Sequence, residues 1–307
     1  MSFWRTLFHG GMEERREKRG AERTVQIDPL DKRIGKVLED RLEIKGLVGE
    51  GGLSRVYLAR DKQNGEETAV KFARENGISL EISERFLAKE IEAMRRVSHP
   101  NIVDFKGCGT SEQRLYLLME YVEGKSFADI VERDGHLPWK RARGTILQVC
   151  DALSEVHSKG MVHGDVKLGN VVLVRRNGKD IAKLFDFGLS RFMDGTMDST
   201  PVGYAAGTAS YVAPEILRVK PFDQRVDVFS LGVTIYRTLS GKPPFDGKDG
   251  LETAYAVLRD EPLPLGKQEA CHGIPARLEK AVMTAIEKDP EKRFHDMGEF
   301  KAELENA

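Results

Sequence analysis

The sequence reads His163-Gly164-Asp165-Val166-Lys167-Leu168-Gly169-Asn170 and, further along the chain, Asp186-Phe187-Gly188. These two short segments bring carboxylates, a lysine and an amide close together along the chain. Taken alone, each carboxylate is explained as well by a helix N-cap or a surface ion pair. The meaning of the two segments therefore depends on the sequence around them.

Upstream, the glycine-rich segment Gly49-Glu50-Gly51-Gly52 lies between two strand-like segments, 42–45 and 56–59. Closely spaced glycines let backbone N–H groups approach phosphate oxygens that a Cβ atom would keep at a distance. A plain glycine-rich hairpin is the simpler explanation of this segment by itself.

Lys71 lies in a third strand-like segment, 68–73, which follows a turn at Asn64-Gly65. Hydrophobic residues then recur at helical spacing over 84–97. This helix can turn the carboxylate of Glu90 toward the ammonium group of Lys71. The pairing favours phosphate binding over a plain hairpin.

The rest of the chain reads as mainly helical. Residues 126–129 resemble a capping box, 139–159 are amphipathic, and 229–239 are apolar on nearly every face, which is typical of a buried helix. The sequence thus predicts a β-rich lobe followed by a helical one. We expect a flexible tail at 1–38, a first lobe at 39–121, a hinge at 121–124, a second lobe at 125–303 and a C-terminal end at 304–307.

Composition excludes several classes of protein. The 307 residues carry 48 Lys+Arg against 49 Asp+Glu, which argues against a nucleic-acid-binding protein. The longest apolar runs, such as Val171–Val174, are too short to cross a bilayer, so we expect no transmembrane segment. The three cysteines form no C-x-x-C pair and indicate neither a disulfide framework nor a zinc site. We therefore expect a cytoplasmic protein.

The first residues of the chain are apolar, but the run is too short for a signal peptide. The alternative to a flexible tail is a weak docking segment at residues 3–8, where the apolar side chains share one helical face. Those side chains are Phe3, Trp4, Leu7 and Phe8.

In this order, and with Ala213-Pro214-Glu215 further on, the motifs resemble those of the eukaryotic-type (Hanks) protein kinases. The resemblance covers about residues 42–303. The amino-acid sequence of residues 51–57 is most similar to that of the bacterial serine/threonine members. It implies an α+β, two-lobed protein kinase fold, with one regulatory helix in the β-rich lobe. It also implies transfer of the ATP γ-phosphate to Ser or Thr hydroxyls of protein substrates.

The resemblance assigns roles to the residues quoted above. Asp165 would be the catalytic base, and Lys167 would neutralise charge on the transferred phosphoryl group. Thr208, in a loop that resembles that of the serine/threonine members, would bond both. Lys71, oriented by Glu90, would hold the α- and β-phosphates.

The same resemblance implies a metal and a nucleotide site. Asn170 and Asp186 would hold Mg²⁺ through oxygen atoms, and Mn²⁺ accepts the same ligands. Adenine would lie between Val56, Ala69 and Val172, with Met119 behind it and with backbone hydrogen bonds from Glu120 and Val122. The full expected nucleotide site is Gly49, Glu50, Gly51, Gly52, Leu53, Ser54, Val56, Ala69, Lys71, Met119, Glu120, Val122 and Val172.

Other positions match structural roles in the family. Asp227 would hold the loop around Asp165 from the buried helix, and Glu215 with Arg293 would form a buried ion pair. A stacked hydrophobic spine would contain Met94, Phe105, His163 and Phe187.

The sequence departs from the family at Gly164, where most regulated members carry an arginine that receives a loop phosphate. We expect a non-RD kinase whose activity depends only weakly on phosphorylation of the loop, with Arg191 as the alternative phosphate receptor. The loop is nevertheless rich in hydroxyl groups, so we expect autophosphorylation.

Two other functions compete with this interpretation. Small-molecule kinases of the aminoglycoside or choline type often read H-G-D-x-x-x-x-N, but Lys167 and the segments 186–188 and 207–215 belong to kinases of polypeptides. A pseudokinase scaffold normally lacks the lysine, the base or a metal ligand, and all of these are present.

Overall fold

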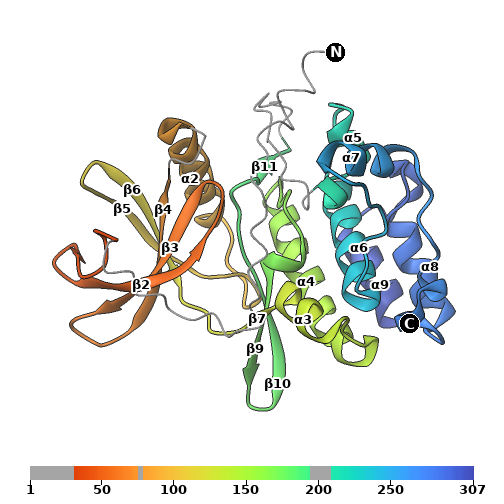
Figure 1. The fold of residues 1–307 in the computed structure, drawn as a ribbon, viewed down its shortest axis with the longest axis horizontal. Helices are drawn as coiled ribbons and strands as arrows, with labels where there is room; N and C mark the ends of the chain where they lie inside the picture. Colours follow the sequence, from red (N-terminus) through yellow and green to blue (C-terminus); the bar gives the residue numbers. More distant parts are fainter. Residues whose placement is uncertain (1–30, 75–78, 194–208) are drawn as a thin grey trace.

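A computed structural model describes residues 31–74, 79–193 and 209–307, and these residues form two lobes (Figure 1). The first lobe contains an antiparallel sheet with the strand order β1-β2-β3-β4-β6-β5. Helix α2 (Leu80–Met94) contacts β4 and β6. The strands are β1 (Val37–Leu38), β2 (Leu42–Glu50), β3 (Ser54–Asp61), β4 (Glu67–Ala73), β5 (Phe105–Ser111) and β6 (Arg114–Glu120).

Strand β4 divides the interior of this lobe into two clusters. Val70 and Phe72 pack in one apolar cluster, whereas Ala69 and Ala73 belong to another that includes residues of α2. Alternate side chains of a strand point to opposite faces of the sheet. Lys71 is therefore on the face that α2 covers, although the strand around it is almost entirely buried.

Helix α2 is displaced along the chain from the predicted range of 84–97. It begins after Ser79, whose hydroxyl accepts a hydrogen bond from the backbone N–H of Ile82 at 3.4 Å, and it ends at Met94. A serine N-cap of this kind satisfies one of the free N–H groups of the first turn. The inward face still includes Glu90, as the sequence predicts.

Residues 31–38 belong to the first lobe, which corrects the expectation that a flexible tail extends to residue 38. Strand β1 pairs with β2, Leu38 is only 3% exposed, and the Tyr57 hydroxyl donates a hydrogen bond to Asp31 at 2.8 Å. Strand β1 has only two residues, and the contact of Asp31 involves one side chain, so no periodic pattern in the sequence predicts them. The expectations for residues 1–30, including docking through 3–8, fall outside the described residues.

The second lobe is mainly helical, and its described residues add two small sheets, one with the strand order β10-β9-β7 and one with the order β11-β8. Its strands are β7 (Lys125–Ser126), β8 (Met161–Val162), β9 (Val171–Arg176), β10 (Lys179–Leu184) and β11 (Arg191–Phe192). Its α-helices are α3 (Phe127–Asp134), α4 (Trp139–Ser158), α5 (Pro214–Leu217), α6 (Arg225–Ser240), α7 (Gly250–Arg259), α8 (Ala276–Ala285) and α9 (Met297–Glu305). Its 3-10 helices are η1 (Leu168–Asn170), η2 (Ala209–Tyr211), η3 (Leu265–Lys267), η4 (Glu269–Cys271) and η5 (Pro290–Lys292).

Several details of this lobe agree with the sequence. The capping box at the start of α3 is present, with the Ser126 hydroxyl accepting from the Asp129 N–H and the Asp129 carboxylate accepting from the Ser126 N–H. In α6, all residues except Arg225 and Arg237 are buried, which confirms the predicted buried helix. Helix α9 continues to Glu305, past the predicted end of the lobe at 303. Among the residues that the structure describes, no helix has the length and apolar character needed to cross a membrane.

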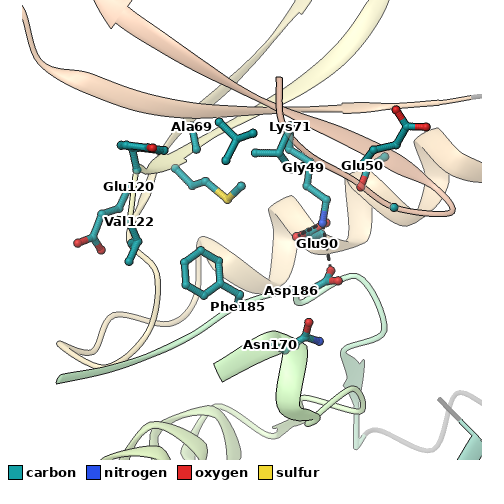
Figure 2. Close-up of a pocket in the computed structure, with 17 residues that line it drawn as sticks. Gly49, Glu50, Ala69, Lys71, Glu90, Glu120, Val122, Asn170, Phe185 and Asp186 are labelled. Atoms are coloured by element: carbon teal, nitrogen blue, oxygen red, sulfur yellow. Dashed lines mark hydrogen bonds and ion pairs between the residues drawn. The ribbon is translucent and has the colours of Figure 1, made fainter. Parts of the chain in front are cut away.

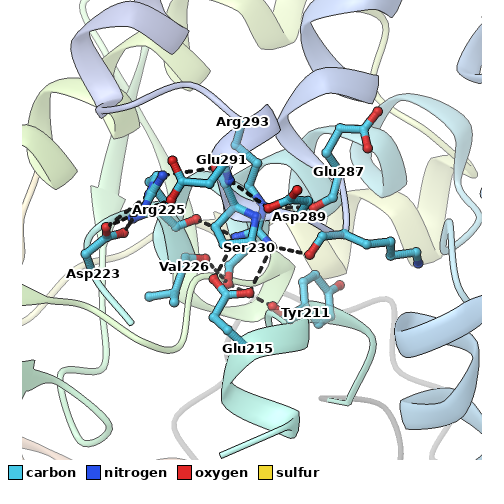
Figure 3. A network of polar contacts seen from close by, with 12 residues as sticks. Tyr211, Glu215, Asp223, Arg225, Val226, Ser230, Glu287, Asp289, Glu291 and Arg293 are labelled. Atoms are coloured by element: carbon cyan, nitrogen blue, oxygen red, sulfur yellow. Dashed lines mark hydrogen bonds and ion pairs between the residues drawn. The ribbon is translucent and has the colours of Figure 1, made fainter. Parts of the chain in front are cut away.

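A buried ion pair joins Glu215 of α5 to Arg293, which lies between η5 and α9 (Figure 3). The two outer nitrogens of Arg293 donate to the two carboxylate oxygens of Glu215 at 2.8 and 2.9 Å, and its Nε donates to the carbonyl of Glu287 at 2.8 Å. The guanidinium also lies 4.9 Å from the ring centroid of Phe229. Because the pair is bidentate and its remaining donors are occupied, each charge is compensated in a low-dielectric interior.

Replacing Arg293 with methionine leaves Glu215 as an unpaired buried carboxylate. We expect Arg293→Met to lower the free energy of unfolding by about 3–5 kcal/mol, measured by denaturant titration. The matched control is Arg277→Met, which breaks an exposed pair with Glu303 and should cost less than about 1 kcal/mol. Equal losses in the two variants would contradict a bracing role for the Glu215–Arg293 pair.

Candidate active site

A pocket lies between the two lobes, beneath the sheet of the first lobe and above η1 (Figure 2). Most of the residues that the sequence indicates for a nucleotide site line it. The lining consists of Val48, Gly49, Glu50, Gly51, Ser54, Val56, Ala69, Lys71, Glu90, Met119, Glu120, Tyr121, Val122, Gly169, Asn170, Phe185 and Asp186. The sequence did not indicate Val48, Tyr121, Gly169 and Phe185, although each is next to a residue that it did.

Three expected residues are not part of the lining. Gly52 and Leu53 lie at the tip of the β2–β3 hairpin, beyond the pocket wall. Val172 is completely buried where β9 pairs with Ser126 of β7. The expectation that Val172 forms one side of an adenine site is therefore corrected, because its side chain has no exposed surface and packs in the apolar core.

Lys71 reaches across the pocket to two carboxylates. Its Nζ lies 2.7 Å from Glu90 on α2 and 3.0 Å from Asp186, which follows β10 (Figure 2). Burial lowers the pKa of Lys71, but Asp186 and Glu90 outweigh it and raise the pKa above its ordinary value. Lys71 is thus a permanent cation at the back of the pocket.

The two carboxylates differ in how readily they take up a proton. Burial raises the pKa of Glu90 to about 7, with Lys71 opposing the rise. Burial acts in the same direction on Asp186, but Lys71 and Lys167 together prevail and lower its pKa to about 2. Asp186 is therefore the carboxylate that stays ionised under all ordinary conditions.

Asp165 lies at the floor of the site and is tightly held. Lys167 Nζ lies 2.6 Å from its Oδ2, and Asn170 Nδ2 donates to the same oxygen at 2.9 Å and to the Asp165 carbonyl at 2.8 Å. Burial raises the pKa of Asp165, while Lys167 opposes the rise. Both side-chain bonds go to Oδ2, so among the described residues Oδ1 keeps its lone pairs for another donor.

Asp227 on α6 holds the backbone just before Asp165. Its carboxylate accepts hydrogen bonds from the N–H groups of His163 and Gly164 at 2.8 and 2.9 Å, and it bonds His157 Nε2 at 2.8 Å. The first two contacts join the buried helix to the loop, as the sequence predicts for Asp227, and the third joins it to α4. A carboxylate with this many donors has its charge compensated although it is fully buried.

His163 is a packed interior residue. Its Nδ1 accepts from the Asp165 N–H at 3.2 Å, which leaves Nε2 to donate to the Phe185 carbonyl at 3.1 Å. Burial lowers the pKa of His163, in agreement with a neutral ring. The ring centroid lies 4.7 Å from that of Phe187, and both side chains are fully buried.

Gly164 has a left-handed backbone with φ +74°, and a Cβ atom added there would lie 2.8 Å from the Leu189 carbonyl oxygen. Glycine adopts this conformation without strain, whereas other residues do so at a cost. Gly164 therefore departs from the arginine of the family pattern at a position where the backbone geometry favours glycine.

The donors in the pocket suit a hard divalent cation with oxygen ligands. Asn170 points its amide nitrogen at Asp165 and its oxygen toward Asp186 (Figure 2). Within the described ranges, no group of three His, Cys, Asp or Glu side chains is placed to hold a metal by itself. A Mg²⁺ ion here would need further oxygen ligands from phosphate and water, which is how Mg²⁺ is usually bound.

Glu120 turns its carboxylate away from the pocket to a lysine that the sequence did not indicate. Lys183 of β10 is buried, and its Nζ lies 2.7 Å from Glu120 and 3.3 Å from the Ile102 carbonyl. The backbone N–H of Glu120 donates to Asp104 at 2.9 Å. The contact with Lys183 attaches the end of β6 to the second lobe, and the backbone beyond it, through Val122, lines the pocket.

Two expectations concern the segment between Asp186 and Glu215. Thr208 falls outside the described residues, so its contacts with Asp165 and Lys167 stay a prediction. Arg191 is described, and its guanidinium lies 5.6 Å from the ring centroid of Phe222. Its role as a phosphate receptor also stays a prediction.

Comparisons with known proteins agree with this geometry. The profile of the protein kinase domain matches residues 42–299. The chain is 35% identical over 276 residues to the serine/threonine-protein kinase PknB of Mycobacterium leprae, covering 87% of this chain and 43% of the relative. It is 35% identical over 277 residues to PknB of Mycobacterium tuberculosis, with the same coverage.

A third relative is the serine/threonine-protein kinase pkn3 of Myxococcus xanthus, with 31% identity over 286 residues, 92% of this chain and 52% of the relative. The chain thus spans about half the length, or less, of the curated relatives that it matches. The similarity therefore concerns one region of each relative.

Gly164 and Gly160 offer a direct test of the loop geometry, because both have left-handed backbones, with φ +74° and +70°. No atom lies within 4 Å of a Cβ added at Gly160. We expect Gly160→Ala to lower the free energy of unfolding by about 1–2 kcal/mol, and Gly164→Ala to lower it further because of the clash with Leu189. Denaturant titration of both variants measures this, and a smaller loss at Gly164 would contradict the description of this loop.

Proposed function

This chain belongs to the protein kinase family, and we propose that it transfers the γ-phosphate of ATP to Ser and Thr hydroxyls of protein substrates. The observation that carries the proposal is the Lys71 ammonium group shared between Glu90 and Asp186 at the back of the pocket. A fixed cation beside an ionised carboxylate is what a metal–triphosphate complex requires.

We propose that the nucleotide enters with its adenine between Val56 and Ala69, against Met119. The backbone from Glu120 to Val122 would supply hydrogen bonds to the adenine edge, since the Glu120 carboxylate is engaged by Lys183. The triphosphate would then run beneath the glycine-rich segment to Lys71. The expected contact with Val172 is not part of this proposal.

Asp186 and Asn170 would hold Mg²⁺, which neutralises charge on the phosphate oxygens when it is bound. Lys71 would orient the α- and β-phosphates while Glu90 holds the lysine in place. Lys167 would offset charge on the phosphoryl group in transfer. These residues position the reacting groups and compensate charge, and neither task needs a covalent intermediate.

We propose that Asp165 orients the acceptor hydroxyl and takes its proton at Oδ1. Lys167 and Asn170 both bond Oδ2, which holds the carboxylate in one orientation. The raised pKa of Asp165, caused mainly by burial, makes it a better proton acceptor than an exposed aspartate. Thr208 would hold Asp165 and Lys167 from the substrate side.

The proposed enzyme is of the non-RD type, because Gly164 carries no side chain to receive a loop phosphate. We propose that it phosphorylates itself without depending strongly on that modification. The three cysteines are free thiols, which supports a reducing, ATP-containing compartment such as the cytoplasm.

The proposal is tested by a γ-phosphate transfer assay with ATP and Mg²⁺, using a basic protein as one acceptor and small alcohols, including an aminoglycoside and choline, as the others. We expect transfer to Ser and Thr of the protein only. Transfer to the small alcohols alone would indicate a small-molecule kinase, and nucleotide binding without transfer would indicate a scaffold. Phosphatase treatment beforehand should change the rate by less than about twofold if loop phosphorylation matters little.

Asp165→Asn is the matched inactive variant for this assay. We expect turnover to fall by about 10²–10⁴-fold, since a positioned general base contributes about that much. Binding of ATP, measured by calorimetry, should be nearly unchanged because Asp165 does not line the nucleotide pocket. Turnover close to that of the wild type would contradict the role given to Asp165.

A further inference from the structure

Glu50 is the acidic residue of the glycine loop, by which we mean residues 49–54, and two arginines hold it from different strands. Arg55 Nε lies 2.9 Å from Glu50 Oε2, and Arg74 Nη1 bonds Glu50 Oε1. Arg55 is the cross-strand partner of Glu50 in the β2–β3 hairpin, whereas Arg74 follows the end of β4. Each carboxylate oxygen thus has its own arginine.

Arg74 also donates hydrogen bonds to backbone carbonyl groups of the loop. Its Nη1 donates to the Gly51 carbonyl at 3.2 Å, and its N–H donates to the Leu53 carbonyl at 2.9 Å. The loop is further closed by a hydrogen bond from the Gly51 N–H to the Ser54 carbonyl at 2.8 Å. A glycine-rich segment loses more backbone entropy on ordering than any other. These contacts therefore hold the glycine loop in one of the many backbone conformations that glycine can adopt.

The charges explain why two arginines are present. Glu50 and Gly51 line the pocket where the triphosphate would lie. A free carboxylate there would repel phosphate oxygens, and a like-charge contact opposes binding. With Arg55 and Arg74 attached, the negative charge of Glu50 is compensated, so this repulsion is removed.

The same network continues into the N-terminal segment of the first lobe. Asp31 lies 3.8 Å from Arg55 and accepts the hydrogen bond from Tyr57. Asp31 therefore limits how far the Arg55 side chain can swing away from Glu50. The glycine loop is connected in this way to residues 31–38, whose strand β1 pairs with β2 at the edge of the sheet.

We infer that Arg55 and Arg74 are positioning residues that act on the nucleotide triphosphate through Glu50. The inference rests on the proposed function, since it concerns the same pocket. It assigns the two arginines no contact with the nucleotide. Their effect is to hold the loop in its phosphate-binding shape and to cancel the charge of Glu50.

The experiment is a double-mutant cycle on nucleotide binding, measured by calorimetry with ATP and with adenosine. We expect Arg74→Gln to weaken ATP binding by about twofold to fivefold, the range for a partly exposed ion pair, and to leave adenosine binding unchanged. In a Glu50→Gln background the same substitution should weaken ATP binding by less than about 1.5-fold, because the coupled partner is gone. Arg55→Gln should behave in the same way.

The control is Lys45→Gln, which breaks an exposed ion pair with Glu43 on β2, away from the pocket, and should leave both affinities unchanged. Raising the salt concentration should weaken ATP binding more in the wild type than in Glu50→Gln, since a partly exposed pair is screened. Thermal unfolding of each variant verifies that the fold is retained.

Three results would overturn the inference. The first is an equal loss of ATP affinity for Arg74→Gln with and without Glu50, which would mean that Arg74 acts directly on the phosphates. The second is an equal loss for adenosine, and the third is no loss at all. A wild type that binds ATP but transfers no phosphate would defeat the proposed function and leave the binding cycle valid, whereas a wild type that binds no ATP would defeat both.

Discussion

The buried ammonium group of Lys71 holds three segments of the chain in one place. Strand β4 carries the lysine, α2 supplies Glu90, and the segment after β10 supplies Asp186. A buried charge without a partner costs several kcal/mol, at about 3–5 kcal/mol for a broken pair. The position of α2 against the sheet and the position of Asp186 beneath it are therefore set by one requirement. The pocket exists between them as a consequence.

The second lobe is organised by the same kind of constraint. Backbone N–H groups of the loop that carries Asp165 compensate the negative charge of Asp227. Arg293 compensates the negative charge of Glu215. Near neutrality of the whole chain, with a formal net charge of −1, conceals these internal pairs. Charge is used locally, within the protein interior and around one pocket.

Much of this arrangement could be predicted from the sequence, because the order of its motifs resembles that of a family in which these positions have defined roles. Lys71 meets Glu90 as expected, and His163 is an interior residue as expected, whereas the direct contact of Lys71 with Asp186 was not predicted. Val172 was wrong as a pocket residue, because its side chain is completely buried in the apolar core. Local sequence does not determine whether an apolar side chain of a strand faces the core or a pocket.

The contacts that escaped prediction share a physical reason. Residues 31–38 were predicted to be flexible, yet they join the sheet through individual contacts such as that of Asp31 with Tyr57. Lys183 and Arg74 each find a partner that is distant in sequence, at Glu120 and Glu50. A single long-range pair leaves no periodic signal, whereas a helix or strand does.

Lys71 and its two carboxylates prepare the pocket for a metal–triphosphate complex. Calorimetric titration of ATP into the wild type and into Asp186→Asn, each with and without Mg²⁺, tests this most directly. We predict that Mg²⁺ tightens ATP binding to the wild type and has little effect on Asp186→Asn. ATP affinity that is independent of Mg²⁺ in the wild type, or equally dependent on it in both proteins, would contradict the account.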